Sequence, residues 1–214
     1  MKKEQIILIG GGGHCKSCID VIEAEGKYQI AGIVDVPERI GQKILGYEII
    51  ASDEMIPELS KEYINFFITI GQIKPNRLRK NIVSVLEQYH VNFPVIISPT
   101  AVVSNRAQIG EGTIVMHQAV VNTNAVIGRH NIINTAAIVE HDVKSGDFCH
   151  ISINATIGGS AKIGDNCFIG GGAFLFNNIL LMNDIVVGAG SVVNRSYNEN
   201  GILLKGNPAK SIKY

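Results

Sequence analysis

The stretch IGGSAKIGDNCFIGGGAF, residues 157–174, repeats one pattern every six residues: an aliphatic residue, then glycine, with a small residue at the fifth position. This register covers sixteen hexads, from 97 to 192, without an insertion or deletion. The first position is Ile, Val or Leu in fifteen hexads, with Ser145 as the exception, and the fifth is Ala, Ser, Thr or Cys in twelve. A period of six is neither helical nor simple strand alternation, so it predicts stacked short strands with an aliphatic core. We expect the turns, with positive φ, at the second position, where Gly and Asn are frequent.

The N-terminal half has a different sequence pattern, which predicts strands alternating with helices. Apolar runs predict strands over 5–9, 28–35 and 64–71, and amphipathic runs predict helices over 14–26 and 76–89. This alternation indicates a small parallel α/β sheet. We therefore expect two domains, over residues 1–94 and 95–214.

Composition excludes several function classes. The 214 residues carry 19 basic and 19 acidic side chains, so charge gives no argument for binding nucleic acid or an anionic membrane surface. No apolar run is long enough to span a bilayer, and the first residues lack a signal-peptide pattern. We expect a cytoplasmic protein with no membrane insertion, whose four cysteines are free thiols.

A glycine run follows the first predicted strand. Glycines at 10–13 let backbone N–H groups and a helix N-terminus approach a phosphate. Asp35 lies 23 residues after Gly12, where an acid can reach a ribose hydroxyl. Cys15 occupies a position that the dinucleotide pattern gives to glycine, so an NAD site is not expected. A purely structural tight turn stays an alternative.

The hexads closely resemble the hexapeptide-repeat acyltransferases. This resemblance implies a left-handed parallel β-helix with three hexads per coil, so that residues 18 apart stack. It also implies a homotrimer with active sites between neighbouring prisms. The fold class is therefore a Rossmann-like α/β domain followed by a left-handed parallel β-helix. An inert scaffold remains possible, because a fold does not fix a function.

The whole chain resembles a narrower group. The glycine loop ending in His14, the VD at 34–35, the IGQ at 70–72 and the EHD at 140–142 resemble nucleotide-aminosugar N-acetyltransferases of bacterial glycan synthesis. Enzymes that make diacetylated bacillosamine belong to this group, and sialic-acid O-acetyltransferases share its layout. By resemblance, the acceptor nucleotide is held by Gly10, Gly12, Gly13, His14 and Asp35, with Ile70, Gly71 and Arg77 or Arg79 nearby.

The triplet Glu140-His141-Asp142 interrupts the aliphatic repeat. Acetyl transfer to an amine or hydroxyl needs a base, and histidine titrates near neutrality. A carboxylate on the other ring nitrogen fixes the tautomer. We predict His141 as the general base; the resemblance favours Asp142 as its partner, and Glu140 stays open. By the same resemblance His150 contacts the acceptor or the acetyl group, with packing as the alternative, and Asn134 contacts the sugar amine. A solvated turn is the alternative for His141.

The donor side follows from the end of the chain. The segments VVGAGSVV at 186–193 and LLKGNPAK at 203–210 resemble the closing motif of acetyl-CoA-dependent hexapeptide enzymes. This resemblance implies acetyl-CoA as the co-substrate and no metal. It assigns Gly159, Gly171 and Ala189 to the pantetheine, and Lys205 and Lys210 to the CoA phosphates. Turn glycines and solvated lysines are the alternative.

Other classes fit the sequence less well. Cys15 and Cys18 form a C-x-x-C, but no second such pair completes a zinc site, and a redox motif leaves the hexads unexplained. The γ-type carbonic anhydrases use histidine pairs five residues apart, whereas His141 and His150 are nine apart. The sequence thus predicts direct acetyl transfer from acetyl-CoA to the amine of a nucleotide-linked 4-amino-sugar for surface glycan synthesis. Sialic acid O-acetylation and a non-catalytic nucleotide-sugar-binding scaffold are the alternatives.

Overall fold

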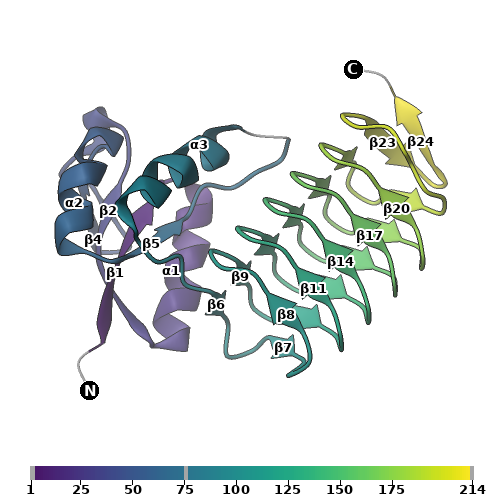
Figure 1. The fold of residues 1–214 in the computed structure, drawn as a ribbon, viewed down its shortest axis with the longest axis horizontal. Coiled ribbons are helices and arrows are strands. Elements are labelled where there is room, and N and C mark those ends of the chain that lie inside the picture. Colours follow the sequence, from purple (N-terminus) through teal and green to yellow (C-terminus); the bar gives the residue numbers. More distant parts are fainter. Residues whose placement is uncertain (1–2, 75–76, 213–214) are drawn as a thin grey trace. The chain divides into compact units, whose positions relative to one another are not determined.

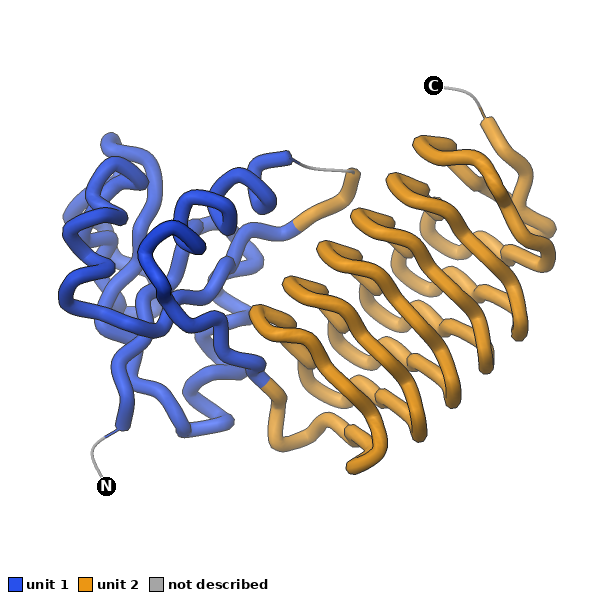
Figure 2. The backbone as a smooth tube through the Cα atoms, in the orientation of Figure 1, with its two compact units in different colours: residues 1–71, 77–96 blue, residues 72–76, 97–214 orange. Residues whose placement is uncertain are grey.

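A computed structural model describes residues 3–74 and 77–212 of the chain (Figure 1). The chain forms two compact units, one of residues 1–71 and 77–96 and one of residues 72–76 and 97–214 (Figure 2). The first is an α/β unit and the second is a β-helix unit, so the predicted fold class is confirmed. In the described segments, no helix is long and apolar enough to cross a membrane.

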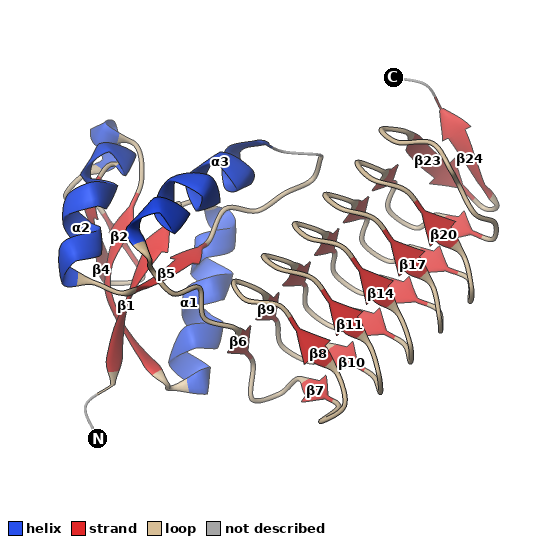
Figure 3. Cartoon of the chain, viewed as in Figure 1, coloured by secondary structure: helices blue, strands red, loops and turns tan. Residues whose placement is uncertain are grey.

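The α/β unit contains a five-stranded sheet in the order β3-β4-β2-β1-β5, covered by helices (Figure 3). Strands β1, β2, β4 and β5 are parallel, and β3 pairs with β4 in the antiparallel sense. Its elements are β1 (Glu4–Ile9), α1 (Gly13–Glu25), β2 (Tyr28–Val34), η1 (Pro37–Arg39), β3 (Lys43–Ile44), β4 (Tyr47–Ala51), η2 (Asp53–Met55), α2 (Ile56–Glu62), β5 (Asn65–Ile68), α3 (Arg77–Leu86) and η3 (Glu87–Tyr89).

Most predicted elements of this unit are present. Helix α1 ends at Glu25 and is capped by Gly26, whose N–H donates to Ile22 O. The φ of Gly26 is 73°, a left-handed conformation that glycine adopts readily at helix ends. Strand β5 ends at Ile68, earlier than predicted. The helix predicted over 76–89 is α3 followed by η3, and residue 76 lies outside the described residues. Strands β3 and β4 and helix α2 were not predicted, because such short elements carry little periodicity.

From β6 to β22 the β-helix unit is a stack of two-residue strands joined by four-residue turns, and the longer strands β23 and β24 follow. Its strands are β6 (Ile96–Ile97), β7 (Val102–Val103), β8 (Gln108–Ile109), β9 (Ile114–Val115), β10 (Val120–Val121), β11 (Val126–Ile127), β12 (Ile132–Ile133), β13 (Ile138–Val139), β14 (Lys144–Ser145), β15 (His150–Ile151), β16 (Thr156–Ile157), β17 (Lys162–Ile163), β18 (Phe168–Ile169), β19 (Phe174–Leu175), β20 (Leu180–Leu181), β21 (Val186–Val187), β22 (Val192–Val193), β23 (Leu203–Gly206) and β24 (Ala209–Ile212).

These strands form three parallel sheets, which we name after their first strand. The β6 face runs β24-β23-β21-β18-β15-β12-β9-β6, the β7 face β22-β19-β16-β13-β10-β7, and the β8 face β20-β17-β14-β11-β8. Only the β23–β24 pair is antiparallel. Residues 18 apart are partners, as in Val121 with Val139, which confirms three hexads per coil. The first corner joins the β6 face to the β7 face, the second joins the β7 face to the β8 face, and the third joins the β8 face to the β6 face.

The first hexad position points into the coil. Val121, Val139 and Ile157 stack in successive coils and are fully buried. Burying one such side chain contributes roughly 1.5–3 kcal/mol, so the column forms the core of the unit. Ser145, the exception in the sequence, is buried as well, and Asn131 Nδ2 lies 3.5 Å from its Oγ.

The expected position of the positive-φ residue was wrong. Left-handed φ angles recur at the fourth hexad position, as at Asn124 (57°), Asp142 (60°) and Asn166 (58°). Glycine is frequent at the second position for another reason: the next coil leaves no room for a Cβ there. A Cβ on Gly128 would lie 2.4 Å from Asp147 Oδ1, and one on Gly146 would lie 2.1 Å from Asp165 Oδ1.

These carboxylates form a ladder along the third corner. Asp147 Oδ1 accepts a hydrogen bond from Arg129 N at 2.7 Å, and Asp165 Oδ1 accepts one from Asp147 N at 2.8 Å. Each carboxylate therefore satisfies a backbone donor of the preceding coil, and the second-position glycine leaves room for it.

Gly146→Ala should lower the free energy of unfolding by about 1–3 kcal/mol, because the added methyl group collides with the Asp165 carboxylate. Urea denaturation followed by circular dichroism measures this loss. Lys162→Ala, at an exposed outward position of β17, is the control and should change stability by less than about 0.5 kcal/mol. Equal losses in both variants would show that the coil admits a methyl group at the second position.

Candidate active site

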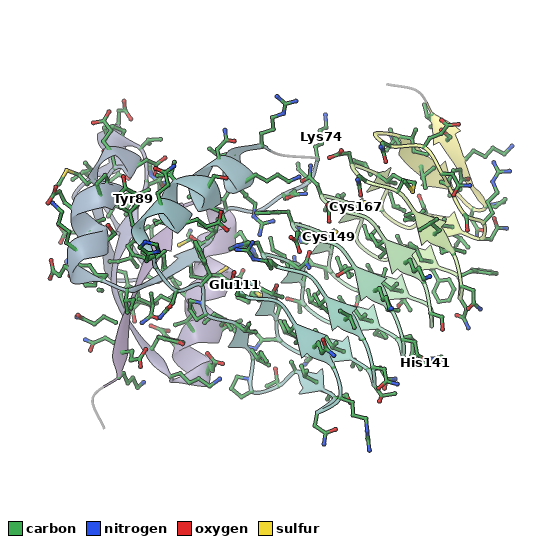
Figure 4. All side chains as sticks on the ribbon, in the orientation of Figure 1. Lys74, Tyr89, Glu111, His141, Cys149 and Cys167 are labelled. Carbon is green, nitrogen blue, oxygen red and sulfur yellow. The ribbon has the colours of Figure 1, made fainter. Side chains whose placement is uncertain are left out.

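The second corner places His141 beside Asp142. Strand β13 ends at Val139, and the left-handed φ of Asp142 turns its carboxylate toward the imidazole. His141 Nδ1 lies 2.9 Å from Asp142 Oδ2, and both side chains are half exposed. Figure 4 shows His141 at the margin of the stacked coils. A hydrogen-bonded His–Asp pair is thus accessible on the surface of the coil.

The hydrogen bond defines what this pair can do. The bond from His141, followed by a smaller contribution from Asn124, lowers the pKa of Asp142, so its carboxylate is ionised at neutral pH. A carboxylate accepts only, so His141 Nδ1 donates, and in the neutral ring with this tautomer Nε2 carries the lone pair. An imidazole in this tautomer can take a proton from an attacking amine or hydroxyl.

Glu140 does not contact the imidazole ring. Its Oε2 accepts hydrogen bonds from Asn122 Nδ2 at 3.0 Å and from the backbone N of His141 at 3.2 Å. Glu140 therefore stabilises the turn, whereas Asp142 contacts Nδ1. Of the two carboxylates that the sequence left open, Asp142 is the one hydrogen-bonded to the ring.

Asn124 adjoins the His–Asp pair, and the sequence analysis did not name it. It lies one coil before Asp142, and its Nδ2 is 3.3 Å from Asp142 Oδ1. The carboxylate thus has Asn124 on one oxygen and His141 on the other. The signal was present in the sequence, since residues 18 apart stack.

Gly159 lies one coil after His141. A Cβ at this position would be 2.6 Å from His141 Nε2. The absence of a side chain leaves room for the imidazole ring, whose Nε2 lies against Gly159. The sequence assigned Gly159 to the donor site, and the structure places it directly against the predicted base.

Asn134 and His150 lie together at another place on the coil. His150 begins β15 on the β6 face, is buried, and packs edge-on against Phe168 with ring centroids 5.3 Å apart. Its Nε2 is 2.9 Å from Asn134 Nδ2, and its Nδ1 bonds to the backbone oxygen of Gln72. Within one chain these residues therefore adjoin the first corner, whereas His141 is on the second.

The predicted donor residues are also divided. Gly171 and Ala189 are 18 residues apart and stack in the first corner, away from Gly159 in the second. Lys205 and Lys210 are cross-strand partners in the β23–β24 hairpin, and both are exposed. Like charges directly opposite each other are unfavourable, so an anion there would relieve repulsion.

The predicted acceptor residues meet at the carboxyl edge of the α/β sheet. Gly10 adopts a φ of 101°, and Gly11 N donates to Asp35 Oδ2 at 3.0 Å. The Arg39 guanidinium also bonds to this carboxylate, which the sequence analysis did not predict. A Cβ on Gly12 or on Gly13 would meet nothing within 4 Å, so the backbone at the start of α1 is accessible.

His14 follows this loop. Burial, and secondly the positive charge of Arg79, lowers the pKa of His14 to about 4, so the ring is neutral at neutral pH. A Cβ on Gly71 would lie 3.4 Å from the Cβ of His14, so Gly71 adjoins it. Arg79 is itself buried in α3, so of the two candidate arginines only Arg77 is exposed.

The cysteines give no support to a redox site. Cys15, Cys18, Cys149 and Cys167 are all buried and free. Burial is the main cause that raises the pKa of Cys15 and of Cys18, so their thiolates are disfavoured. Cys149 and Cys167 lie in successive coils, as predicted (Figure 4). In residues 3–74 and 77–212 no cluster of His, Cys, Asp and Glu is arranged to hold a metal ion.

Comparison with protein families agrees with both units. Residues 5–86 match the PglD N-terminal domain, and residues 146–177 match the bacterial transferase hexapeptide (six repeats). Over 120 residues the chain is 32% identical to UDP-N-acetylbacillosamine N-acetyltransferase of Bacillus subtilis, a match that covers 53% of this chain and about half, 51%, of that protein.

Solved structures match over nearly the whole chain. A mutant of perosamine N-acetyltransferase from Caulobacter crescentus, in complex with CoA and GDP-perosamine, is 33% identical with a TM-score of 0.92 and covers 98% of this chain and 97% of its own. The acetyltransferase domain of PglB from Neisseria gonorrhoeae, in complex with acetyl coenzyme A, is 33% identical with a TM-score of 0.89 and covers 99% and 100%.

The hexapeptide β-helix, which carries a hydrogen-bonded His–Asp pair at one corner, places the chain in the class of hexapeptide-repeat transferases. Within it, the chain belongs to the acetyltransferase family that carries a PglD-type N-terminal domain and includes the nucleotide-aminosugar N-acetyltransferases. The resemblance stated from the sequence is confirmed.

Gly159→Ala should reduce kcat by at least about tenfold, because the methyl group pushes His141 Nε2 out of position. Steady-state kinetics measures this effect. Lys162→Ala, at an exposed outward position of β17, is the control for a substitution in the same coils. Full activity in Gly159→Ala would mean that Nε2 does not act in the position seen here.

The low pKa of His14 can be measured directly. In histidine-labelled protein, the NMR resonance that His14→Gln removes should titrate near pH 4. Because this folded-state pKa is below the ordinary value of 6.5, the stability that neutral His14 gives is full above pH 6.5 and is lost as the pH falls toward 4. A midpoint near 6.5 would contradict the buried, neutral ring.

Proposed function

We propose that this protein transfers the acetyl group of acetyl-CoA to the amino group of a nucleotide-linked 4-amino-sugar used in bacterial surface glycan synthesis. One observation carries the proposal: His141 has Nδ1 held by Asp142 and Nε2 beside Gly159, which has no side chain. The similarity to enzymes crystallised with CoA and GDP-perosamine, or with acetyl coenzyme A, supports the substrate classes.

The reaction is a direct attack. The sugar amine forms a bond to the thioester carbonyl carbon while His141 Nε2 takes a proton from the amine. The C–S bond then breaks, and the proton passes from the imidazolium to the CoA thiolate. Asp142 stabilises the imidazolium, and backbone N–H groups support the oxyanion. A general base of this kind contributes about 10²–10⁴ in rate.

The acceptor and donor use different surfaces. Backbone N–H groups at Gly12 and Gly13 bind the diphosphate of the acceptor, and His14 and Gly71 adjoin it. Asp35 binds the ribose through a free lone pair, since Gly11 and Arg39 fix its orientation. The small residues of the first corner give room to the pantetheine of CoA, and Lys205 and Lys210 bind its phosphates.

We further propose a homotrimer whose copies meet at the β7 face. Outward residues on this face are Val102, Val120, Ile138, Thr156, Phe174 and Val192, an apolar row on an exposed sheet. His141 borders one edge of this face and Asn134 borders the other. A head-to-tail ring joins unlike edges, so it would bring Asn134, His150 and the donor corner of one copy to His141 of the next.

Two alternatives lose support. A non-catalytic scaffold does not need a half-exposed histidine whose Nδ1 is held by an ionised carboxylate. Sialic acid O-acetylation could use the same base, but the compared enzymes are N-acetyltransferases. We place the reaction in the cytoplasm because bacterial acetyl-CoA is produced there.

His141→Ala should lose at least about a hundredfold in kcat, measured as CoA thiol release with GDP-, UDP- and dTDP-4-amino-sugars and with free sialic acid. Asp142→Asn should also lose rate, because its amide can donate to Nδ1 and favour the wrong tautomer. Turnover of sialic acid alone would replace the acceptor class, and unchanged rates in both variants would refute the base.

Ile138→Asp should convert trimers to monomers, because it places a carboxylate in the proposed apolar interface. Light scattering should give three times the chain mass of 23.1 kDa for the wild type and the chain mass for the variant. Lys162→Asp, on the β8 face, is the matched control and should stay trimeric. A wild-type protein that is monomeric at micromolar concentration would contradict the trimer.

A further inference from the structure

A cavity of about 210 Å³ lies in the α/β unit, between the start of α2 and one side of α3. Leu78 and Val85 on α3 are 49% and 39% exposed, so aliphatic surface faces solvent there. A carboxylate and an amide are the polar groups of the lining. The lining residues are Asp53, Ile56, Leu78, Asn81, Ile82 and Val85. A cavity below the size that takes a drug-sized ligand suits one planar part of a larger molecule.

Strand order relates this cavity to the nucleotide. Strands β1, β2 and β4 are neighbours in the sheet, and they are followed by the glycine loop, Asp35 and Asp53 in that order. Asp35 N donates to Ala51 O at 3.1 Å, which joins the second and third of these positions. Adjacent strands are about 4.8 Å apart, so phosphate, ribose and base would lie over successive strand ends.

We infer that this cavity seats the nucleobase of the acceptor and that Asp53 reads it, selecting guanine. The inference rests on the proposed function, because that function puts the diphosphate at the glycine loop and the ribose at Asp35. It names the nucleotide, which differs among the compared enzymes: one is named for a UDP-linked sugar and another was crystallised with a GDP-linked sugar.

Hydrogen-bond chemistry favours guanine. An ionised carboxylate offers two acceptor oxygens, and guanine presents two adjacent donors, its N1–H and its 2-amino group. Uracil and thymine present one N–H between two carbonyl oxygens, so one of these faces the second carboxylate oxygen. Asn81 can donate to the guanine carbonyl, while Leu78 and Ile82 pack against the ring.

The charge environment of Asp53 agrees with this role. Burial, and secondly the charge of Asp35, raises the pKa of Asp53, so its ionised form is disfavoured without a donor. Two N–H groups from a base would offset that cost. Asp53 and the neighbouring acid Glu54 are both exposed, but of the two only Asp53 lines the cavity.

The test is equilibrium binding of GDP, UDP and dTDP to the full-length protein by titration calorimetry. The wild type should bind GDP most tightly. Asp53→Asn should weaken the binding of GDP about 10- to 100-fold, because the side chain loses one acceptor and gains a donor. The same substitution should change the affinity for UDP by less than about threefold. Leu78→Trp, which fills the cavity, should weaken all three nucleotides.

Controls separate the possible failures. Glu54→Gln should bind as the wild type does, and CoA binding should be unchanged in every variant, which shows that each is folded. If GDP and UDP bind equally and Asp53→Asn changes neither, the inference is wrong; loss of both nucleotides in Asp35→Asn would then leave the proposed function standing. If the wild type binds no nucleotide, both the inference and the proposal of a nucleotide-linked acceptor are wrong.

Discussion

Stacking of hexads at a spacing of 18 residues is the constraint on which the rest of the β-helix depends. Backbone hydrogen bonds join each coil to the next, as from Ile138 N to Ala155 O at 2.9 Å and from Glu140 N to Ile157 O at 3.0 Å. Because every hexad has the same length, each side chain lies over the one 18 positions away. A single insertion would shift every later column, and the aliphatic first positions would leave the core.

The candidate base uses the same columns. Asn124 and Asp142 share one column, and His141 and Gly159 share the next, so Asn124 supports the carboxylate and Gly159 leaves room for the imidazole. A rigid coil suits this purpose because a general base must stay within hydrogen-bond reach of the proton that it takes. The polar residues that interrupt the repeat therefore indicate where the site lies, because the aliphatic core does not require them.

Glycine serves different ends in the two units. In the α/β unit, Gly10 has a left-handed φ, and its neighbours leave backbone accessible at the start of α1. In the coils, glycine at the second position leaves room for a carboxylate or for another backbone. Composition cannot separate these causes. The expectation of positive φ at the second position failed because backbone crowding between coils is a property of the stack, not of one hexad.

By itself, the sequence determined the period, the core column, the α/β sheet and the histidine between carboxylates, because each depends on residue type at fixed spacing. It did not determine β3, β4 and α2, whose short runs are held by contacts with the rest of the unit. Only the tertiary structure decided which carboxylate contacts the imidazole, which is Asp142 and not Glu140, and that Asn124 lies against that carboxylate. It also decided that His150 is hydrogen-bonded to the backbone oxygen of Gln72. These contacts depend on which side chains the turns bring within hydrogen-bonding distance of one another. The distances between the turns are set by how the coils pack in three dimensions.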